Sequence, residues 1–186
     1  MKYWDRKEEL FKYIDGVRQF FPLATEQLDT IARLIDKFIP DMVTFLDLGC
    51  GDGFLGHFIY RLYSGSQGVF LDISEEMINK ARAKDKDHHS EFIVQDFAKP
   101  DWFKSVSGLK KFDLIISGYS IHHIDNNEKR RLYKDIFDLL NLRGLFLNLE
   151  HVSSPTRMLE DTFNELFLDK MAEYQKHTGE EKRKKK

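Results

Sequence analysis

The sequence has little cysteine and no long apolar run. Its single cysteine, Cys50, allows no disulfide within the chain, which suits a reducing compartment. The longest apolar runs are far shorter than the roughly twenty residues that a membrane-spanning helix needs. The first ten residues, MKYWDRKEEL, are charged and lack the apolar stretch of a secretory signal. From these absences we expect a cytoplasmic protein with no membrane partner.

An excess of charge of either sign is also missing. The 186 residues carry 29 Lys and Arg against 31 Asp and Glu, a formal net charge of −2, so no overall field attracts nucleic acid. The exception is the basic end, EEKRKKK. It is open to interpretation as an arm for nucleic acid or anionic lipid, but no aromatic or glycine residues accompany its charge. We expect residues 180–186 to form a charged, disordered tail and expect no nucleic-acid partner.

Five short apolar segments alternate with helical patterns from residue 44 onward. They are TFLDLG (44–49), GVFLDI (68–73), EFIVQD (91–96), FDLIIS (112–117) and GLFLNLE (144–150). Nearly continuous apolar runs of this length are typical of strands that are covered on both faces of a parallel sheet. The order predicts an α/β fold with a doubly wound, mainly parallel sheet of about five strands and helices on both faces.

Helical patterns precede and follow this core. In the front segment, apolar residues recur along one helical face until Pro40. In the back segment, Ser154 and Pro155 begin a helix. No internal repeat and no linker rich in proline, glycine or serine is evident, so we expect one domain over 1–179. Its parts are an N-terminal helical cap (1–40), a cofactor-binding core (44–152) and a C-terminal helix (153–179).

The clearest helical pattern of the core is NEKRRLYKDIFDLLN. Leu132 and Ile136 lie on its apolar face, and Asp125 with Glu128 has the spacing of a capping box at its start. We expect Gly144 to mark the C-terminal end of this helix, directly before the last strand.

The stretch FLDLGCGDGFLG can be aligned with two glycine motifs that start at different residues, which we call two frames. Read as G-x-G-x-x-G from Gly51, it predicts a dinucleotide site. Read from Asp47, an acidic residue is followed by glycine at every second position, Gly49, Gly51 and Gly53. Only the second frame places a turn glycine directly after the strand, and an acidic residue there suits an ammonium group better than a pyrophosphate. We adopt the second frame, and an NAD-binding protein stays the less favoured alternative.

LDLGCGDG resembles the first motif of the class I S-adenosylmethionine-dependent methyltransferases. GVFLDIS, IVQDFA and FDLIISGYSIHHI are similar to the next three motifs, and LLNLRGLFLNLEHV resembles the helix, glycine turn and fifth strand that follow. The similarity covers residues 44–152. It implies that the chain moves the methyl group of S-adenosyl-L-methionine to an unidentified small-molecule acceptor by in-line displacement and leaves S-adenosyl-L-homocysteine.

The resemblance also implies roles for individual residues. Asp72 would accept hydrogen bonds from the ribose hydroxyls, Asp96 from the adenine amine, and Phe97 would pack on the adenine ring. Arg18, in RQFFP, resembles an arginine that approaches the cofactor carboxylate, although a surface arginine before a turn needs no function. The full set expected to bind the cofactor is Arg18, Asp47, Gly49, Gly51, Gly53, Asp72, Ile73, Asp96, Phe97 and Ser117.

Three residues are candidates for catalysis, namely Tyr119, His122 and His123. A histidine could act as a general base if the acceptor is an oxygen or nitrogen that must lose a proton. The form SIHHI also occurs in family members with unrelated substrates, which favours packing and cofactor-pocket duties instead. Metal binding would need further ligands at suitable spacing, which the other pair, His88-His89, does not have around it. We predict no metal site.

The resemblance ends after the fifth strand. Family members usually continue with another helix and an antiparallel pair of strands, whereas here one helix and a charged tail follow Val152. The fifth strand is therefore expected to be an exposed apolar edge. Three explanations stay open: a truncated chain, a last helix that covers the edge, or a homodimer through this edge or the C-terminal helix. A non-catalytic or truncated S-adenosylmethionine-binding protein is the corresponding alternative function.

Overall fold

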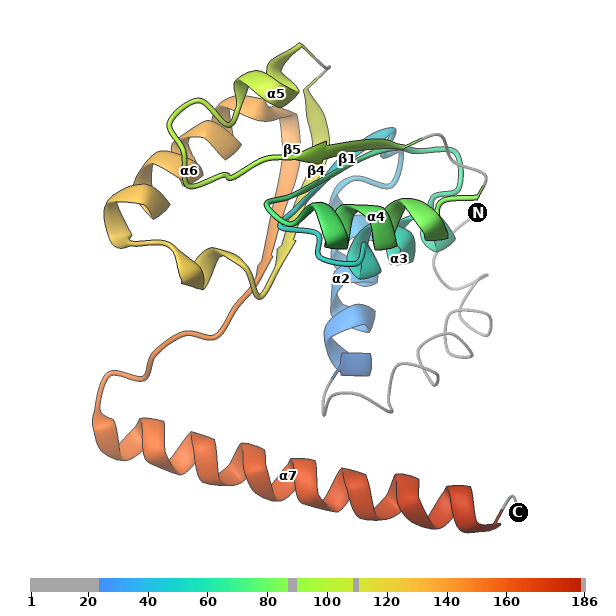
Figure 1. Ribbon diagram of the computed structural model, residues 1–186, viewed down its shortest axis with the longest axis vertical. Coiled ribbons are helices and arrows are strands. Elements are labelled where there is room, and N and C mark those ends of the chain that lie inside the picture. The colour runs from blue at the N-terminus through green and yellow to red at the C-terminus, as the bar shows by residue number, and fades with distance from the viewer. Residues whose placement is uncertain (1–23, 87–89, 109–110, 185–186) are drawn as a thin grey trace. The chain divides into compact units, whose positions relative to one another are not determined.

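The computed structural model describes residues 24–86, 90–108 and 111–184 (Figure 1). The predicted cofactor residue Arg18 and the pair His88-His89 lie outside these ranges. The chain divides into two compact units: residues 34–151 form one, and residues 1–33 with 152–186 form the other. The organisation as a single domain over 1–179 stays a prediction.

The unit of residues 34–151 is built on a five-stranded sheet in which every pair of neighbours is parallel. Its strands are β1 (Thr44–Leu48), β2 (Gln67–Asp72), β3 (Glu91–Val94), β4 (Phe112–Gly118) and β5 (Leu140–Leu149). They lie in the order β3-β2-β1-β4-β5, so the direction of winding reverses between β1 and β4. Doubly wound sheets bind ligands at the carboxyl ends of the strands at such a reversal. The predicted fold class is confirmed.

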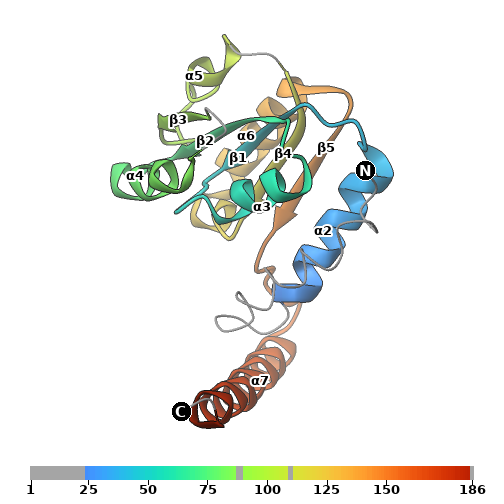
Figure 2. The same cartoon turned by 90° about the vertical axis from the view of Figure 1, so that its right-hand side faces the viewer.

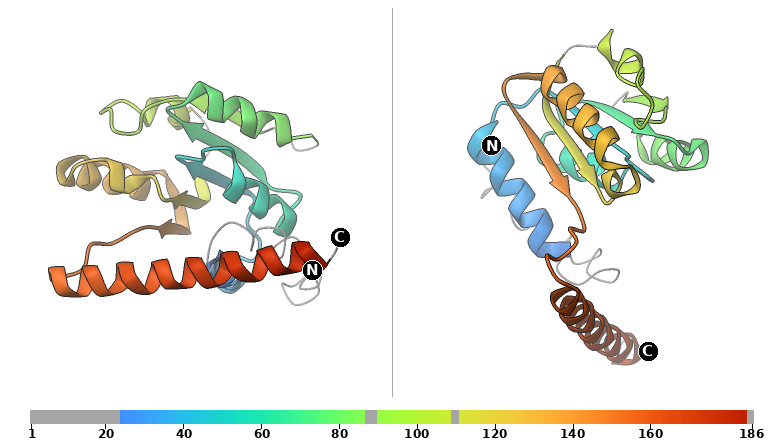
Figure 3. Two further views of the ribbon diagram at one scale, coloured as in Figure 1. Left: turned by 60° about the horizontal axis from the view of Figure 1, so that its bottom comes forward. Right: turned by 90° about the vertical axis from the view of Figure 1, so that its left-hand side faces the viewer.

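Helices cover both faces of this sheet. Within the unit of residues 34–151, the helices that lie wholly inside it are α3 (Phe54–Leu62), α4 (Glu75–Lys84), α5 (Lys104–Ser107), a short 3-10 helix η2 (Ile121–His123) and α6 (Asn126–Leu139). The other described helices are α2 (Ala24–Phe38), which begins in the other unit, and α7 (Arg157–Lys184), which lies entirely in it. Helices α3 and α4 lie on one face of the sheet and α6 on the other (Figures 2 and 3). The start of α6 has the predicted capping box, in which the Asp125 side chain accepts from the backbone N–H of Asn127 and Glu128.

Two layers of buried side chains hold the sheet between its helices. Successive strand residues point to opposite faces, so Phe45 and Leu46 belong to different layers. On the α3 side, the Phe45 ring lies edge-on to Tyr60 and Phe70, with centroid distances of 5.0 and 5.9 Å. On the α6 side, the cluster around Leu46 includes the fully buried Trp102. Aromatic side chains thus pack in both layers, beneath α3 and beneath α6.

Gly56 allows α3 to lie close against β2. A Cβ at this position would come within 2.2 and 2.5 Å of the ring of the fully buried Phe70. We expect Gly56→Ala to lower the free energy of unfolding by about 1–3 kcal/mol, because the packed ring must shift. Urea denaturation measures the change, with Gly65→Ala as the matched control, since a Cβ there meets no described atom within 4 Å. Equal stability of the two variants would contradict this packing.

The boundary between α6 and β5 differs from the prediction. The helix ends at Leu139, and Leu140 already pairs with Phe112, so Gly144 is not a helix cap but lies within β5. The register shifts between Phe112 and Leu114, and Arg143 has a left-handed backbone, with φ of 68°. A helix C-terminus and an irregularity in a strand can each require a residue with a left-handed backbone. The same Arg-Gly sequence can therefore mark either feature.

The strand β5 is an edge strand of the sheet, with no second strand neighbour among the described residues. There β5 pairs only with β4, which agrees with the expected exposed edge, and the Leu142 residue is 96% exposed. Closure of this edge by a second copy or by the last helix stays a prediction.

In the other unit, α7 begins later and ends later than expected. It starts at Arg157, where Thr156 Oγ1 accepts a hydrogen bond from the Leu159 N–H (3.3 Å), and it continues to Lys184 rather than ending at 179. Its Phe163 and Leu166 side chains are exposed. Among the helices of the described ranges, none is both long and apolar enough to cross a membrane.

Candidate functional site

A turn of left-handed glycines connects β1 to α3. Gly49, Gly51 and Gly53 have φ of 70°, 53° and 80°, a conformation that residues with a Cβ rarely adopt. The turn is tied to the end of β2, because the backbone N–H groups of Gly49 and Cys50 donate to the Leu71 carbonyl at 2.8 and 3.0 Å. Glycine at every second position is therefore explained by backbone geometry, as the second sequence frame requires.

The loop after β4 lies directly against Gly49. A Cβ on Gly49 would come within 2.3 Å of Ser120 Oγ and 3.2 Å of the Phe97 ring. Ser120 Oγ donates to the Leu48 carbonyl (3.2 Å) and pairs with Ser117 Oγ (2.8 Å). Ser117 is fully buried and also donates to the Leu48 carbonyl (2.8 Å), so its hydroxyl holds the end of β1 at which the turn begins. Ser120 is not among the predicted site residues, although the Ser-x-x-Ser spacing from Ser117 could have indicated it.

Asp47 is a buried acid with one unsatisfied oxygen. The residue is 1% exposed, and its Oδ2 accepts from the Gly56 N–H at 2.8 Å at the start of α3. Its Oδ1 is buried without a hydrogen-bond partner among the described residues. The pKa of Asp47 is raised from 3.8 to about 7, mainly by burial; the hydrogen bond from the Gly56 N–H lowers it, and the nearby acids Asp72 and Asp52 raise it. An orphaned carboxylate oxygen near a glycine turn fits a cationic ligand group.

Asp72 joins the glycine turn to the end of β2. Its Oδ2 accepts from the Gly51 N–H at 2.8 Å, and its Oδ1 accepts from the Ser74 N–H at 2.9 Å. Each carboxylate oxygen can accept a further hydrogen bond. The next residue, Ile73, is 67% exposed and presents an apolar side chain beside this carboxylate. The same side chain can thus shape the turn and accept from a diol.

Asp96 and Phe97 follow β3 at the same edge of the sheet. Asp96 Oδ1 accepts from the Ala98 N–H at 2.8 Å, and Lys99 Nζ lies 3.9 Å from Oδ2. Phe97 belongs to the aromatic and aliphatic residues that pack partly buried against the core. Because the Phe97 ring also lies close to Gly49, the structure brings the ends of β1, β2, β3 and β4 together at one edge.

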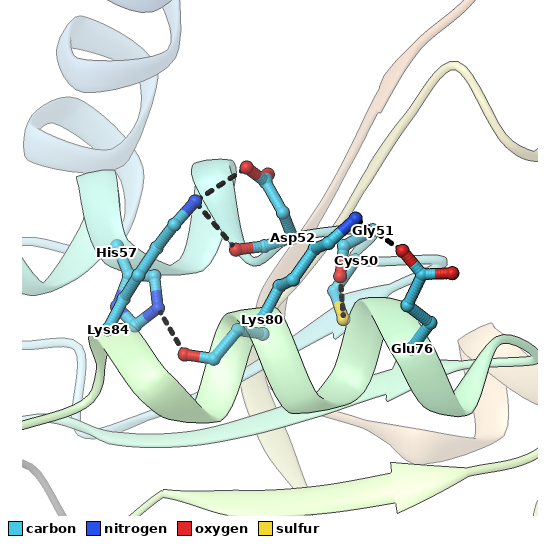
Figure 4. Close-up of polar contacts among 8 residues, drawn as sticks. Cys50, Gly51, Asp52, His57, Glu76, Lys80 and Lys84 are labelled. Carbon is cyan, nitrogen blue, oxygen red and sulfur yellow. Dashed lines mark hydrogen bonds and ion pairs between the residues drawn. The ribbon is translucent and has the colours of Figure 1, made fainter.

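Helix α4 braces the outer side of the turn (Figure 4). Lys84 Nζ lies 2.5 Å from Asp52 Oδ2 and donates to the Asp52 carbonyl, and His57 Nε2 lies 3.0 Å from the Ala81 carbonyl oxygen. The exposed Lys84–Asp52 ion pair contributes little energy. Cys50 is buried within the turn, and this burial raises the pKa of its thiol, as do Asp47 and Asp72. A thiol held neutral is a poor nucleophile, which agrees with its interpretation as a structural residue.

A second group of polar side chains lies at the ends of β4 and β5. Tyr119 has a left-handed backbone, with φ of 53°, and its N–H donates to the Leu149 carbonyl at 2.8 Å. Its ring lies 5.2 Å from that of His151. His122 Nδ1 lies 2.8 Å from Glu150 Oε2. A non-glycine residue in this conformation is often held in place by function. In the described ranges, no three histidine, cysteine or acidic residues are grouped to hold a metal ion.

The fold and this edge define a class of protein. An all-parallel sheet of this order, with a glycine turn after β1 and acids at the ends of β1 and β2, is a Rossmann-like core of the kind that the class I S-adenosylmethionine-dependent methyltransferases share with dinucleotide-binding folds. The chain belongs to the methyltransferase-domain family, whose model matches residues 40–186. The predicted family, enzyme class and cofactor are therefore confirmed.

Among curated relatives, the chain is similar to the carboxy-S-adenosyl-L-methionine synthase of Nautilia profundicola, with 27% identity over 96% of this chain and 73% of the relative. It is 32% identical to the malonyl-[acyl-carrier protein] O-methyltransferase 2 of Ilyobacter polytropus, over 77% of this chain and 53% of that protein. The chain therefore spans only about half of the latter protein's length.

Among solved structures, the chain is similar to the plantazolicin methyltransferase BpumL in complex with a pentazolic desmethylPZN analog and SAH. The TM-score is 0.60 at 19% identity, over 83% of this chain and 60% of that one. The PH0226 protein from Pyrococcus horikoshii OT3 has a TM-score of 0.51 at 29% identity, over 73% and 64%. The BpumL likeness, at this low identity, supports the fold alone.

Proposed function

We propose that the chain transfers the methyl group of S-adenosyl-L-methionine to a small-molecule acceptor. The observation that carries this proposal is the shared edge, where the glycine turn and Asp72 lie beside the polar group at the ends of β4 and β5. The turn offers a cofactor seat, and Ser120 links it to a second set of side chains that an acceptor could contact. A sheet edge with both parts is suited to bringing two reactants together.

The residues of this edge fit the cofactor. The unpartnered Oδ1 of Asp47 would attract the ammonium of its methionine end. Gly51 would allow close approach, because a Cβ there meets no described atom within 4 Å. Asp72 would accept from the ribose hydroxyls while it holds the turn. Arg18, outside the described ranges, stays a proposed partner of the carboxylate.

The nucleoside end would lie beyond Asp72. Asp96 would accept from the adenine amine, Phe97 would pack on the ring, and Ile73 would cover it from the other strand end. Gly49, Gly53 and Ser117 would shape the seat rather than touch the cofactor through side chains, because the Ser117 hydroxyl is already bonded to Leu48 and Ser120.

The bound cofactor supplies an electrophilic methyl group on a sulfonium. The residues of the chain then have to hold the acceptor in line with the sulfur–methyl bond and keep water out, and positioning of this kind supplies a large part of the rate. Tyr119, His122 and His123 are the side chains proposed to face the acceptor.

Asp72→Ala is expected to weaken binding of S-adenosylhomocysteine by about 100-fold or more, because each hydrogen bond to a charged group is worth about 1.5–3 kcal/mol. Isothermal titration calorimetry measures the affinity. Glu76→Gln, which changes an exposed acid of the neighbouring α4, is the matched control and should bind normally. A wild-type chain that binds NAD but neither S-adenosylmethionine nor S-adenosylhomocysteine would restore the dinucleotide frame and overturn the proposal.

Two alternatives to methyl transfer can be distinguished by the product that each would form. A non-catalytic S-adenosylmethionine-binding protein would bind both ligands but transfer no label from methyl-labelled S-adenosylmethionine to any small molecule. In the second alternative, the chain modifies the cofactor itself. The similarity to the Nautilia relative, which is named as a synthase of carboxy-S-adenosylmethionine, favours this alternative. Mass spectrometry of the cofactor after turnover distinguishes the two, because only the second changes its mass without an acceptor.

A further inference from the structure

Glu150 is held at the end of β5 by the turn that follows β4. Its Oε1 accepts from the backbone N–H of Ile121 (2.7 Å) and of His122 (3.3 Å). Its Oε2 lies 2.8 Å from His122 Nδ1, and the Glu150 side chain is only 11% exposed. One carboxylate therefore fixes both the backbone at the start of η2 and the imidazole ring that η2 carries. This pairing joins residues 28 positions apart in the chain.

The pairing decides which nitrogen of His122 carries the proton when the ring is neutral. A carboxylate can only accept hydrogen bonds, so Nδ1 is the donor and Nε2 keeps its lone pair. The His122 side chain is 34% exposed, and no residue of the described ranges hydrogen-bonds to its Nε2. His122 thus presents a basic nitrogen away from the carboxylate. Its neighbour His123 has no such carboxylate among the described residues.

His122 belongs to the same loop after β4 that contacts the glycine turn. Ser120, two residues before His122, is the side chain that a Cβ on Gly49 would meet. The ring of Tyr119, directly before Ser120, lies against His151, which follows Glu150. The dyad of His122 and Glu150 therefore belongs to the segments that follow β4 and β5, at the same carboxyl edge of the sheet as the glycine turn, which is the edge where doubly wound sheets bind ligands.

We propose that His122 is the general base of the methyl transfer and that Glu150 is its positioning residue. The acceptor is then a molecule whose reacting oxygen or nitrogen carries a proton at neutral pH, such as a phenol or an ammonium group. In the transfer, the proton of the acceptor moves to His122 Nε2, and the acceptor lone pair forms the bond to the methyl carbon. The sulfur–methyl bond breaks with its electrons left on sulfur, and the imidazolium later releases its proton to water. This inference rests on the proposed function.

The first test needs no acceptor. Nuclear magnetic resonance of the full chain labelled with ¹⁵N-histidine, recorded at alkaline pH, identifies the tautomer of His122, and His122→Gln assigns its signals. We expect the proton on Nδ1 in the wild-type chain and loss of this preference in Glu150→Gln. Asp138→Asn is the matched control, because it neutralises an acid at the C-terminal end of α6, away from the carboxyl edge. A proton on Nε2, or a tautomer that Glu150→Gln leaves unchanged, would overturn the dyad.

The second test measures transfer from methyl-labelled S-adenosylmethionine to a panel of phenols, primary amines and thiophenols. His122→Ala should slow transfer to phenols and amines by about 10²–10⁴, the usual contribution of a general base. Transfer to thiophenols, which are already ionised at neutral pH, should fall much less, and added imidazole should restore part of the lost activity. An equal loss for all three classes, without rescue, would show that the ring acts only in packing.

The two tests also separate this inference from the proposed function. If calorimetry shows no binding of S-adenosylhomocysteine to the wild-type chain, the proposed function fails, while the tautomer measurement still decides whether the dyad exists. If S-adenosylhomocysteine binds to the wild-type chain and to His122→Ala alike but the tautomer is on Nε2, the proposed function stands and the base assignment fails.

Discussion

Gly49→Ala is expected to lower the free energy of unfolding by about 2–5 kcal/mol and to abolish binding of S-adenosylhomocysteine. The left-handed backbone alone costs a residue with a Cβ about 1–2 kcal/mol, and the close contact adds about 1–3 kcal/mol of overpacking. Ser120 Oγ, at 2.3 Å from the new atom, cannot move without breaking its bonds to Leu48 and Ser117. Urea denaturation and calorimetric titration measure the two effects.

Gly51→Ala is the control that separates strain from contact. Gly51 has φ of 53°, but a Cβ there meets no described atom within 4 Å. The variant should lose only about 1–2 kcal/mol of stability from its backbone, and it should fold. Its affinity for S-adenosylhomocysteine should nevertheless fall steeply, since the new methyl group would stand where the proposed cofactor passes. Normal affinity in folded Gly51→Ala would show that the cofactor does not cover this position.

Raising the pH from about 5 to 8 is expected to destabilise the free protein through Asp47. In the fold the pKa of this buried acid is about 7, against an ordinary value of 3.8. Between these values the folded chain binds more protons than the unfolded chain, so the stability present at low pH is lost as the pH rises through about 7. A shift of about 3 pKa units corresponds to at most about 4 kcal/mol. Asp47→Asn should remove this part of the pH dependence, as urea denaturation of both proteins across the range would show.

The same acid should make cofactor binding respond to pH in the opposite direction. An ammonium group beside Oδ1 favours the ionised carboxylate, so affinity for S-adenosylhomocysteine should increase as the pH rises toward 7, and binding below 7 should release a proton. Calorimetry in buffers with different ionisation enthalpies counts that proton. If neither affinity nor proton release changes with pH in the wild-type chain, Asp47 serves only to hold the Gly56 N–H at the start of α3.

The features that the sequence predicted well are those that arise from neighbouring residues. The strands β1 to β4 were found within a few residues of their bounds, because nearly continuous apolar runs and a glycine turn mark them locally. Asp72 could be found because a strand end and its distance from the turn are readable from the chain. The start of β5 could not, since the pairing of Leu140 with Phe112 overrides a helix-end pattern at Arg143-Gly144.

Contacts between residues that lie far apart in the sequence could not be predicted, because local patterns do not report them. The bond between His122 and Glu150, and the support of Gly49 by Ser120, depend on how β1, β4 and β5 lie side by side, which no local pattern reports. Gly56 shows a different gap. Its match to G-x-G-x-x-G was interpreted as incidental, yet its position is explained by the close packing of α3 on Phe70. A glycine at this place serves helix–strand packing whichever ligand the turn holds.

The two bonds accepted by Asp72 bear on how large variant libraries of this protein would be interpreted. Because its carboxylate holds the Gly51 and Ser74 N–H groups, substitutions at Asp72 will reduce cellular abundance as well as ligand occupancy. At Gly51, by contrast, substitutions spare abundance far more than occupancy. A screen that scores growth alone would rank these positions together, whereas one that also counts folded molecules would tell architecture from recognition.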